Sequence, residues 1–174
     1  MSRAAGKAAN VVLMGFDVDG VLTDGTLYFS SAGDEMKAFS SLDGHGLKML
    51  QRAGVEVAII SGRSSRALEL RAMNLGVKEL HMGVADKRAL LTGLAAQRAI
   101  DLTQTGYMGD DVVDLPVLRA CGFSATAADA HGEVLARVDY VATRGGGRGA
   151  VREVCDLIIR ARGKWDAVMA EYLS

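Results

Sequence analysis

The sequence predicts an α/β fold in which helices cover both faces of a parallel sheet, the doubly wound arrangement. Short apolar runs rich in Val and Ile alternate with segments of helical periodicity along nearly the whole chain. The strands are separated by segments long enough to cross over to a parallel neighbour. The chain has 174 residues, is 49% hydrophobic and contains no linker rich in Gly, Ser or Pro, so we expect one domain over 1–174.

The first third of the chain predicts a strand, a hairpin, a helix and a second strand. Residues 11–16 form an uninterrupted apolar run, which is typical of a buried strand. The segment TLYFSSAGDEMKAF has turn residues at 32–35 between two β-prone runs, so it predicts a small hairpin insert at about 25–40. A helix at 46–52 and the strand VEVAII at 55–60 follow.

The rest of the chain continues the alternation. The expected elements are a helix at 65–75, a strand at 78–82, a helix at 87–99, a strand at 105–108, a helix at 113–120, and short strands at 123–125 and 140–142. Pro116, the only proline, falls in the first turn of its helix, where its missing N–H matters least. A Gly-rich loop and a C-terminal helix from about 151 complete the chain over about 144–172.

Composition excludes several classes of partner. The 21 acidic and 20 basic residues nearly cancel, whereas proteins that bind nucleic acid usually carry a positive excess. No apolar run approaches the roughly 20 residues of a membrane span, and the first ten residues lack the apolar core of a signal peptide. Cys121 and Cys155 lie far apart without metal-binding spacing. We therefore expect a cytoplasmic protein with reduced thiols and neither a nucleic-acid nor a membrane partner.

Polar residues stand directly after four of the predicted strands. In chain order they are Asp17 and Asp19, Ser61-Gly62-Arg63, Asp86-Lys87, and Gly109-Asp110-Asp111. In a doubly wound sheet, ligands bind at the carboxyl ends of the strands. These residues are therefore the candidates for a functional site.

The acidic residues of this set predict a magnesium site. Asp17 and Asp19 are two apart in an extended segment, so their side chains point the same way. Carboxylates placed together repel one another unless a cation intervenes, and Asp110, Asp111 and Asp114 add to the crowding. Mg²⁺, which prefers oxygen ligands, resolves this repulsion.

The neighbouring residues suit a phosphate group. Ser61 and main-chain N–H groups can donate to phosphate oxygens, and Lys87 adds a positive charge. A carboxylate can attack phosphorus to form an aspartyl-phosphate, provided that nearby cations cancel the repulsion between the two anions.

The motif DVDG, Ser61 after an apolar strand, Lys87, and GDDVVD at 109–114 together resemble the haloacid dehalogenase-like phosphohydrolases. The resemblance implies a Rossmann-like core, with Asp17 as nucleophile and Asp19 as general acid and base. It also implies Mg²⁺ held by Asp17, by the main-chain carbonyl of Asp19 and by Asp110. In that pattern Asp111 and Asp114 orient Lys87 or metal-bound water.

Many members of this superfamily carry a separate cap domain, and this chain has no insertion long enough to form one. The site would then be open to water unless neighbouring subunits cover it. The hairpin carries Leu27, Tyr28, Phe29 and Phe39, which we expect to be exposed and able to pack between protomers, although a hairpin folded onto its own domain is an equal alternative.

Six longer stretches resemble the 3-deoxy-D-manno-octulosonate 8-phosphate phosphatases: DVDGVLTDG, GDEMKAFSSLDGHG, ISGR, GDDVVDLPVL, ADAH and GGGRGAVREVCDLI. The resemblance implies a capless, tetrameric, Mg²⁺-dependent enzyme of lipopolysaccharide synthesis, whose substrate is a sugar acid with phosphate and carboxylate at opposite ends. Arg63 and Arg71, eight residues apart, are expected near one face of a helix, where arginine forks suit a carboxylate. The remaining implied sugar contacts are the loop Ser40-Ser41-Leu42-Asp43-Gly44, Gly62, Lys48 and Arg148.

Two other functions stay open at this stage. One is a phosphatase for a nine-carbon relative of the same sugar acid, because sequence does not place the residues that measure substrate length. The other is a non-catalytic assembly module, like those related to sialic-acid-activating synthetases, although the intact acidic set argues against it. His45, His81 and His131 lack metal spacing and are given no role.

Overall fold

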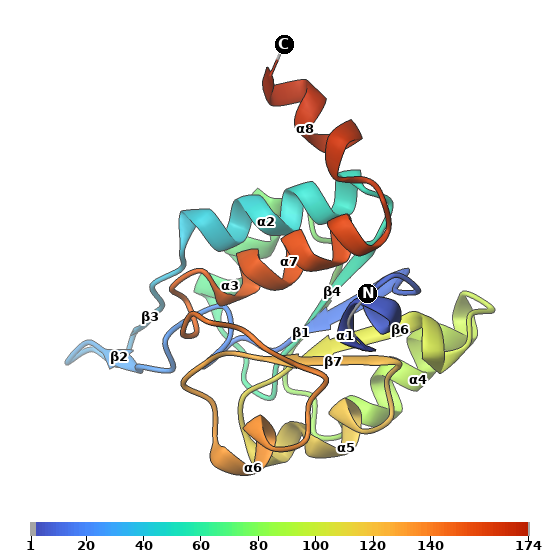
Figure 1. Ribbon diagram of the computed structural model, residues 1–174. Helices are drawn as coiled ribbons and strands as arrows, with labels where there is room; N and C mark the ends of the chain where they lie inside the picture. The colour runs from blue at the N-terminus through green and yellow to red at the C-terminus, as the bar shows by residue number, and fades with distance from the viewer. Residues whose placement is uncertain (1–2, 174) are drawn as a thin grey trace.

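A computed structural model describes residues 3–173 and confirms the doubly wound α/β fold (Figure 1). All six strands of the main sheet run parallel. In spatial order they are β5 (Glu79–His81), β4 (Glu56–Ile60), β1 (Leu13–Phe16), β6 (Thr105–Met108), β7 (Phe123–Thr126) and β8 (Tyr140–Val141). A separate antiparallel pair, β2 (Tyr28–Phe29) and β3 (Glu35–Met36), forms the predicted hairpin, and the described residues include no cap domain.

The order of the strands explains where a site can form. The fully buried strand β1 lies at the centre, paired with β4 on one side and β6 on the other. From β1 the chain proceeds outward through β4 and β5, then returns to the opposite side of β1 to form β6, β7 and β8. The carboxyl end of β1 is therefore the point where the strand order reverses, which opens a crevice in folds of this kind.

Helices cover both faces of the sheet (Figure 1). One face carries α1 (Arg3–Ala8), α2 (Ser41–Arg52), α3 (Arg66–Leu75) and α7 (Ala150–Ala161), and the other carries α4 (Lys87–Gln97), α5 (Leu115–Leu118) and α6 (Gly132–Leu135). Phe16 packs toward the first set, and Leu13 and Tyr107 toward the second. Side chains of β1 thus alternate between two apolar layers, as the pleat of a strand requires.

Helix α2 begins at Ser41, five residues before the predicted start at Gly46. Ser40 is the N-cap and accepts a hydrogen bond from the Asp43 N–H. Gly44 and Gly46 weaken the helical pattern because each costs roughly 1 kcal/mol relative to alanine in a helix. Tertiary packing outweighs that cost, since α2 and α7 pack closely at Gly46, where a Cβ would lie 2.9 Å from the Arg152 side chain.

The predicted C-terminal helix is present and starts at Ala150, but two helices cover the predicted range. Helix α7 ends at Ala161, and after a turn at Gly163, whose φ is +65°, a separate helix α8 (Trp165–Leu173) begins. Figure 1 shows α8 pointing away from the sheet. The guanidinium of Arg160 stacks 3.4 Å from the centre of the Trp165 ring across this turn.

Other local predictions are confirmed or adjusted. Pro116 lies in the first turn of α5, which follows the 3₁₀ turn η2 (Val112–Asp114); a second 3₁₀ turn, η1 (Leu102–Gln104), precedes β6. Phe39 was expected to be exposed but packs partly buried against the core, close to Arg71. None of the helices between residues 3 and 173 is long and apolar enough to span a membrane.

Candidate active site

A pocket of about 430 Å³ lies at the carboxyl ends of β1, β4, β5 and β6. It brings together the residues predicted from all four strand ends. The lining comprises Asp17, Asp19, Gly20, Gly25, Ser61, Gly62, Arg63, Val84, Ala85, Lys87, Asp110, Asp111 and Val113. The convergence expected from a parallel sheet is therefore present in the structure.

Asp17 occupies the floor of this pocket, directly after β1. One carboxylate oxygen, Oδ1, accepts a hydrogen bond from the Val18 N–H at 2.7 Å. The other oxygen, Oδ2, accepts from Lys87 Nζ at 2.6 Å. Burial, and then the charge of Asp114, raise the pKa of Asp17 to about 7, although Lys87 and the Val18 N–H favour the ionised form.

Lys87 joins Asp17 to Asp114. It is the first residue of α4, and its ammonium also donates to Asp114 Oδ1 at 2.7 Å. Asp114 is fully buried, and its second oxygen accepts from the main-chain N–H groups of Asp110 (3.1 Å) and Asp111 (3.4 Å). Desolvation opposes the charge of Lys87, but the two carboxylates outweigh it and raise the lysine pKa. Asp114 thus orients Lys87, whereas Asp111 caps η2 through the Val112 N–H.

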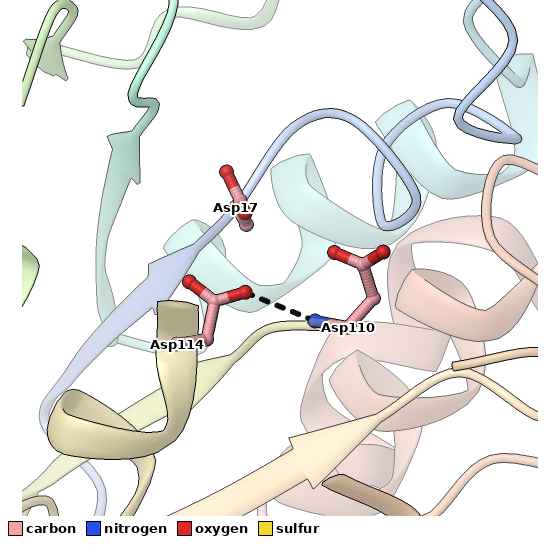
Figure 2. A group of neighbouring side chains, drawn as sticks. All are labelled: Asp17, Asp110 and Asp114. Carbon is pink, nitrogen blue, oxygen red and sulfur yellow. Dashed lines mark hydrogen bonds between the residues drawn. The ribbon is translucent and has the colours of Figure 1, made fainter. Parts of the chain in front are cut away.

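Asp17, Asp110 and Asp114 each bring a carboxylate oxygen within 4.8 Å of the others (Figure 2). Burial and the charges of Asp17, Asp114 and Asp111 raise the pKa of Asp110 to about 7. In this cluster Lys87 contacts Asp17 and Asp114 but does not contact Asp110. A crowded set of oxygen donors that one lysine only partly neutralises fits a hard divalent cation such as Mg²⁺.

Gly20 is required by the close approach of the two acidic segments. Its φ is +79°, and a Cβ at this position would lie 2.0 Å from Asp110 Oδ2. An L side chain would therefore be both strained and in collision with a member of the acidic cluster. Glycine after Asp19 lets the strand end turn beside Asp110.

Ser61 and its neighbours form another part of the pocket wall. Ser61 is buried, and its Oγ accepts a hydrogen bond from the Arg63 N–H at 3.1 Å. Its main chain is fixed to β5 by a bond from its N–H to the His81 carbonyl at 2.9 Å. A Cβ at Gly62 would make only an ordinary van der Waals contact, 3.7 Å from the Val84 carbonyl oxygen. This wall can accommodate phosphate oxygens next to Asp17.

The hairpin contributes two charged residues that sequence reasoning missed. Lys37 contacts Asp19 Oδ1, and its ammonium also lies 2.7 Å from Glu35 Oε1. Arg63 completes the group, with its guanidinium 3.1 Å from Glu35 Oε2. The available signal was the two-residue spacing of Glu35 and Lys37, which places both on one side of an extended segment.

The Gly-rich loop at 144–149 packs against the segment that follows Asp19. The Gly147 N–H donates to the Val21 carbonyl at 2.9 Å. A Cβ on Gly146 would lie 2.0 Å from the Gly20 carbonyl oxygen and 2.8 Å from that of Thr23. The loop is thus in direct backbone contact with the site.

Two predicted sugar contacts face the core instead of the pocket. Asp43 is 1% exposed, and its oxygens accept from the N–H groups of Gly149 (3.1 Å) and Arg152 (2.8 Å), which caps the start of α7. Gly44 is buried against Arg71, whose guanidinium donates to the Ser40 carbonyl at 3.0 Å. The predicted loop is the first turn of α2, so its polar groups serve the helices.

The expected pairing of Arg63 and Arg71 is also wrong, because α3 begins at Arg66 and leaves Arg63 outside the helix. Among the described residues that line the pocket, Arg63 is present and Arg71 is not. The same lining lacks Ser40, Ser41, Leu42, Lys48 and Arg148. Arg148 is 71% exposed and lies 3.3 Å from Asp24, next to the Gly25 edge of the pocket.

Comparison with known proteins places these features in a family. No protein-family model matches the chain. Over 160 residues, 92% of this chain and 85% of the relative, it is 44% identical to the 3-deoxy-D-manno-octulosonate 8-phosphate phosphatase KdsC of Escherichia coli K12.

Solved structures agree with this result. The 3-deoxy-D-manno-octulosonate 8-phosphate phosphatase of Moraxella catarrhalis, in complex with a magnesium ion, a phosphate ion and a KDO molecule, is 41% identical over 99% of both chains, with a TM-score of 0.96. A HAD superfamily (subfamily III A) hydrolase from Legionella pneumophila is 38% identical, covering 98% of this chain and 93% of its own, with a TM-score of 0.93.

Proposed function

The chain belongs to the 3-deoxy-D-manno-octulosonate 8-phosphate phosphatases of the haloacid dehalogenase-like superfamily, and we propose that it hydrolyses this phosphate monoester through an aspartyl-phosphate. It is a phosphoric monoester hydrolase that uses Mg²⁺. The single observation that carries the mechanistic proposal is the meeting of Asp17, Asp110, Asp114 and Lys87 at the end of β1.

In the first step, a carboxylate oxygen of Asp17 attacks phosphorus. A bond forms between that oxygen and phosphorus while the bond from phosphorus to the sugar oxygen breaks, and Asp19 gives a proton to the departing oxygen. Lys87 offsets the negative charge that Asp17 and the phosphate bring together. The Ser61 hydroxyl and the Gly62 N–H hold the phosphate oxygens, while the Arg63 N–H donates to Ser61 Oγ.

In the second step, Asp19 takes a proton from a water molecule as the water oxygen bonds to phosphorus. The bond from phosphorus to Asp17 breaks, which releases inorganic phosphate, restores the Asp17 carboxylate and leaves Asp19 protonated for the next turnover. When bound, Mg²⁺ would offset negative charge on the phosphate. Asp17, the Asp19 carbonyl and Asp110 are the ligands we propose for it.

Arg63 is the residue we propose for the carboxylate end of the substrate. It lines the pocket, and its side chain is 43% exposed, so its guanidinium is accessible to a ligand. Ser40, Ser41, Leu42, Lys48 and Arg148 stay predictions from the family pattern. Asp43, Gly44 and Arg71 are engaged in the contacts described above.

We further propose that the enzyme is a cytoplasmic homotetramer that serves lipopolysaccharide synthesis. Leu27, Tyr28, Phe29 and Met36 of the hairpin are 42–61% exposed, which suits packing against other subunits.

Cys121 and Cys155 are free and buried. Burial raises the Cys121 pKa to about 12, so this thiol does not ionise at neutral pH.

The test is phosphate release in the presence of Mg²⁺ from the eight-carbon substrate and from its nine-carbon homologue, repeated on Asp17→Asn. We expect preference for the eight-carbon acid, loss of activity without Mg²⁺, and a loss of about a thousandfold or more in the variant, because an amide cannot act as the nucleophile. Equal activity of Asp17→Asn would overturn the nucleophile assignment. Preference for the nine-carbon acid would overturn the substrate.

A further inference from the structure

Four charged side chains from three separate segments form a closed ring beside the pocket. Lys37 contacts Asp19 Oδ1 and lies 2.7 Å from Glu35 Oε1. Glu35 Oε2 lies 3.1 Å from Arg63 Nη2, and Arg63 Nε lies 3.6 Å from Asp19 Oδ2. Positive and negative charges alternate around the ring. The hairpin supplies one of each, and the ends of β1 and β4 supply the others.

Lys37 is the best protected member of this ring. Its side chain is 2% exposed, against 16% for Glu35 and 24% for Asp19. A buried ammonium is unfavourable unless carboxylates surround it, and here two do so. Lys37 therefore has a defined position, unlike most lysines on an exposed hairpin.

The two oxygens of Asp19 stand in different environments as a result. Oδ1 is bound by Lys37. Oδ2 lies beyond hydrogen-bond distance of Arg63, on a residue that lines the pocket. Because Oδ1 already accepts a hydrogen bond from Lys37, Oδ2 is the oxygen better placed to give a proton to a substrate oxygen or to take one from water.

We infer that Lys37 is a positioning residue for Asp19, that Glu35 in turn holds Lys37, and that the hairpin is therefore part of the active site. The inference rests on the proposed function, in which Asp19 delivers the proton to the leaving oxygen. Lys37 prevents rotation of the Asp19 carboxylate and keeps Oδ2 directed at the pocket. Orientation of this kind contributes to rate without any contact between Lys37 and the substrate.

Dependence on the leaving group separates this role from a structural one. A sugar alkoxide needs a proton to depart, whereas p-nitrophenolate is stable and departs without one. Misplacing Asp19 should therefore slow cleavage of the sugar phosphate and spare release of p-nitrophenolate in the first turnover. General damage to the fold would slow both reactions.

The experiment compares wild type, Lys37→Met and Lys37→Arg with the octulosonate phosphate in steady state and with p-nitrophenyl phosphate in a single turnover. In Lys37→Met we expect kcat for the sugar phosphate to fall by about 10- to 100-fold, with p-nitrophenolate release changed by less than about threefold. Lys37→Arg, which keeps the charge, should recover most of the loss. Lys78→Met removes an exposed lysine and should change neither reaction.

Glu35→Gln provides a second variant that leaves Lys37 in place. The Glu35→Gln variant should show the same dependence on leaving group, with a smaller loss of kcat for the sugar phosphate than Lys37→Met. Melting temperatures of all variants, measured in the same buffer, identify any that fail to fold.

If Lys37→Met lost the same factor in rate with both substrates, or lost no rate with either, the inference about Lys37 would be overturned. The same comparison can be made with a simple alkyl phosphate such as glycerol 3-phosphate. Failure of the wild type on the octulosonate substrate alone would therefore count against the proposed substrate and not against the role of Lys37. Wild type that cleaves none of these esters would overturn both.

Discussion

At the scale of single residues, Lys87 is the cation that offsets the negative charge of Asp17 and Asp114. Its ammonium lies 2.6 Å from one buried carboxylate, Asp17, and 2.7 Å from another, Asp114. Removing one partner of a buried ion pair leaves an uncompensated charge, which costs far more than the intact pair contributes. Lys87 thus supports both stability and reactivity.

Lys87→Met should therefore affect two measurements at once. We expect phosphate release to fall by about a hundredfold or more, since the ammonium that offsets the charge of Asp17 beside a phosphate is then missing and Mg²⁺ alone remains. Without Mg²⁺, the free energy of unfolding should fall by roughly 3 kcal/mol, because Asp17 and Asp114 are left unpaired in a buried site. Chemical denaturation measures the second effect, and Lys78→Met serves as control. Full activity in Lys87→Met would contradict the assigned role.

At the scale of elements, the loop at 144–149 and helix α7 act as one unit with the segment after β1. Asp43 of α2 caps the start of α7, and Gly146 and Gly147 lie against Gly20 and Thr23. The site is thus supported by a segment more than 100 residues away in the chain. Changes in this loop should reach the chemistry through the backbone around Asp19.

Gly146→Ala tests that contact. Its Cβ would lie 2.0 Å from the Gly20 carbonyl oxygen, and a backbone atom cannot move aside as a flexible side chain can. We expect a loss of about 2 kcal/mol or more in unfolding free energy, together with lower phosphate release. Gly93→Ala in α4, where a Cβ would meet no atom within 4 Å beyond the adjacent helix backbone, should instead stabilise the protein by about 0.5–1 kcal/mol. Equal stability of the two variants would contradict this account.

Glu153 of α7 makes the attachment of β8 sensitive to pH. It accepts hydrogen bonds from the Tyr140 hydroxyl (2.6 Å), the Thr143 N–H (2.9 Å) and the Thr143 hydroxyl (2.7 Å). Burial opposes its ionisation, but these bonds outweigh burial and hold the Glu153 pKa below the ordinary value of 4.5. Because the folded pKa is the lower one, the stabilisation is present above pH 4.5 and is lost as pH falls through the folded pKa.

Glu153→Gln should consequently be less stable than wild type at pH 7, by about 1–2 kcal/mol. The difference in unfolding free energy between variant and wild type should shrink as pH falls below 4.5, the ordinary glutamate pKa, and through the lower folded pKa. Glu153 of the wild type then also becomes protonated. Urea denaturation between pH 7 and pH 3 measures it. Glu133→Gln, which breaks an exposed pair with Arg137, should change stability by less than about 0.5 kcal/mol. A difference for Glu153→Gln that is constant with pH would contradict the linkage.

At the scale of the whole molecule, the hairpin is a projecting feature that carries several exposed large apolar side chains. Figure 1 shows it projecting to one side of the sheet. Its ring of charges faces the pocket, whereas Tyr28, Phe29 and Met36 are exposed. The same insert can thus support Asp19 on one side and contact other subunits on the other.

Sedimentation velocity tests the proposed tetramer. We expect wild type to sediment as a tetramer and the double variant Tyr28→Ser, Phe29→Ser to sediment as a smaller species, because it removes apolar surface from the hairpin. Met73→Ser, at a 72% exposed position on α3, is the control and should remain tetrameric. A wild type that is a stable monomer would contradict the proposal.

Periodicity and strand-end chemistry were sufficient to predict the parallel sheet and its acidic cluster. Asp17, Ser61, Lys87 and Asp110 follow four parallel strands, and parallel strands bring their carboxyl ends to one edge. The start of α2 could not be predicted in the same way. Its glycines at 44 and 46 lower helix propensity, and only packing against Arg71 and α7 compensates for that.

The chemical groups at the ends of the strands could therefore be predicted from the order of amino acids, because alternation and apolar runs are local properties of the chain. Tertiary structure alone decided that Lys37 reaches Asp19, that Asp43 serves α7 and not the pocket, and that the Gly-rich loop lies against Gly20. These contacts join segments between 18 and more than 100 residues apart. They depend on how layers pack, which no local pattern specifies.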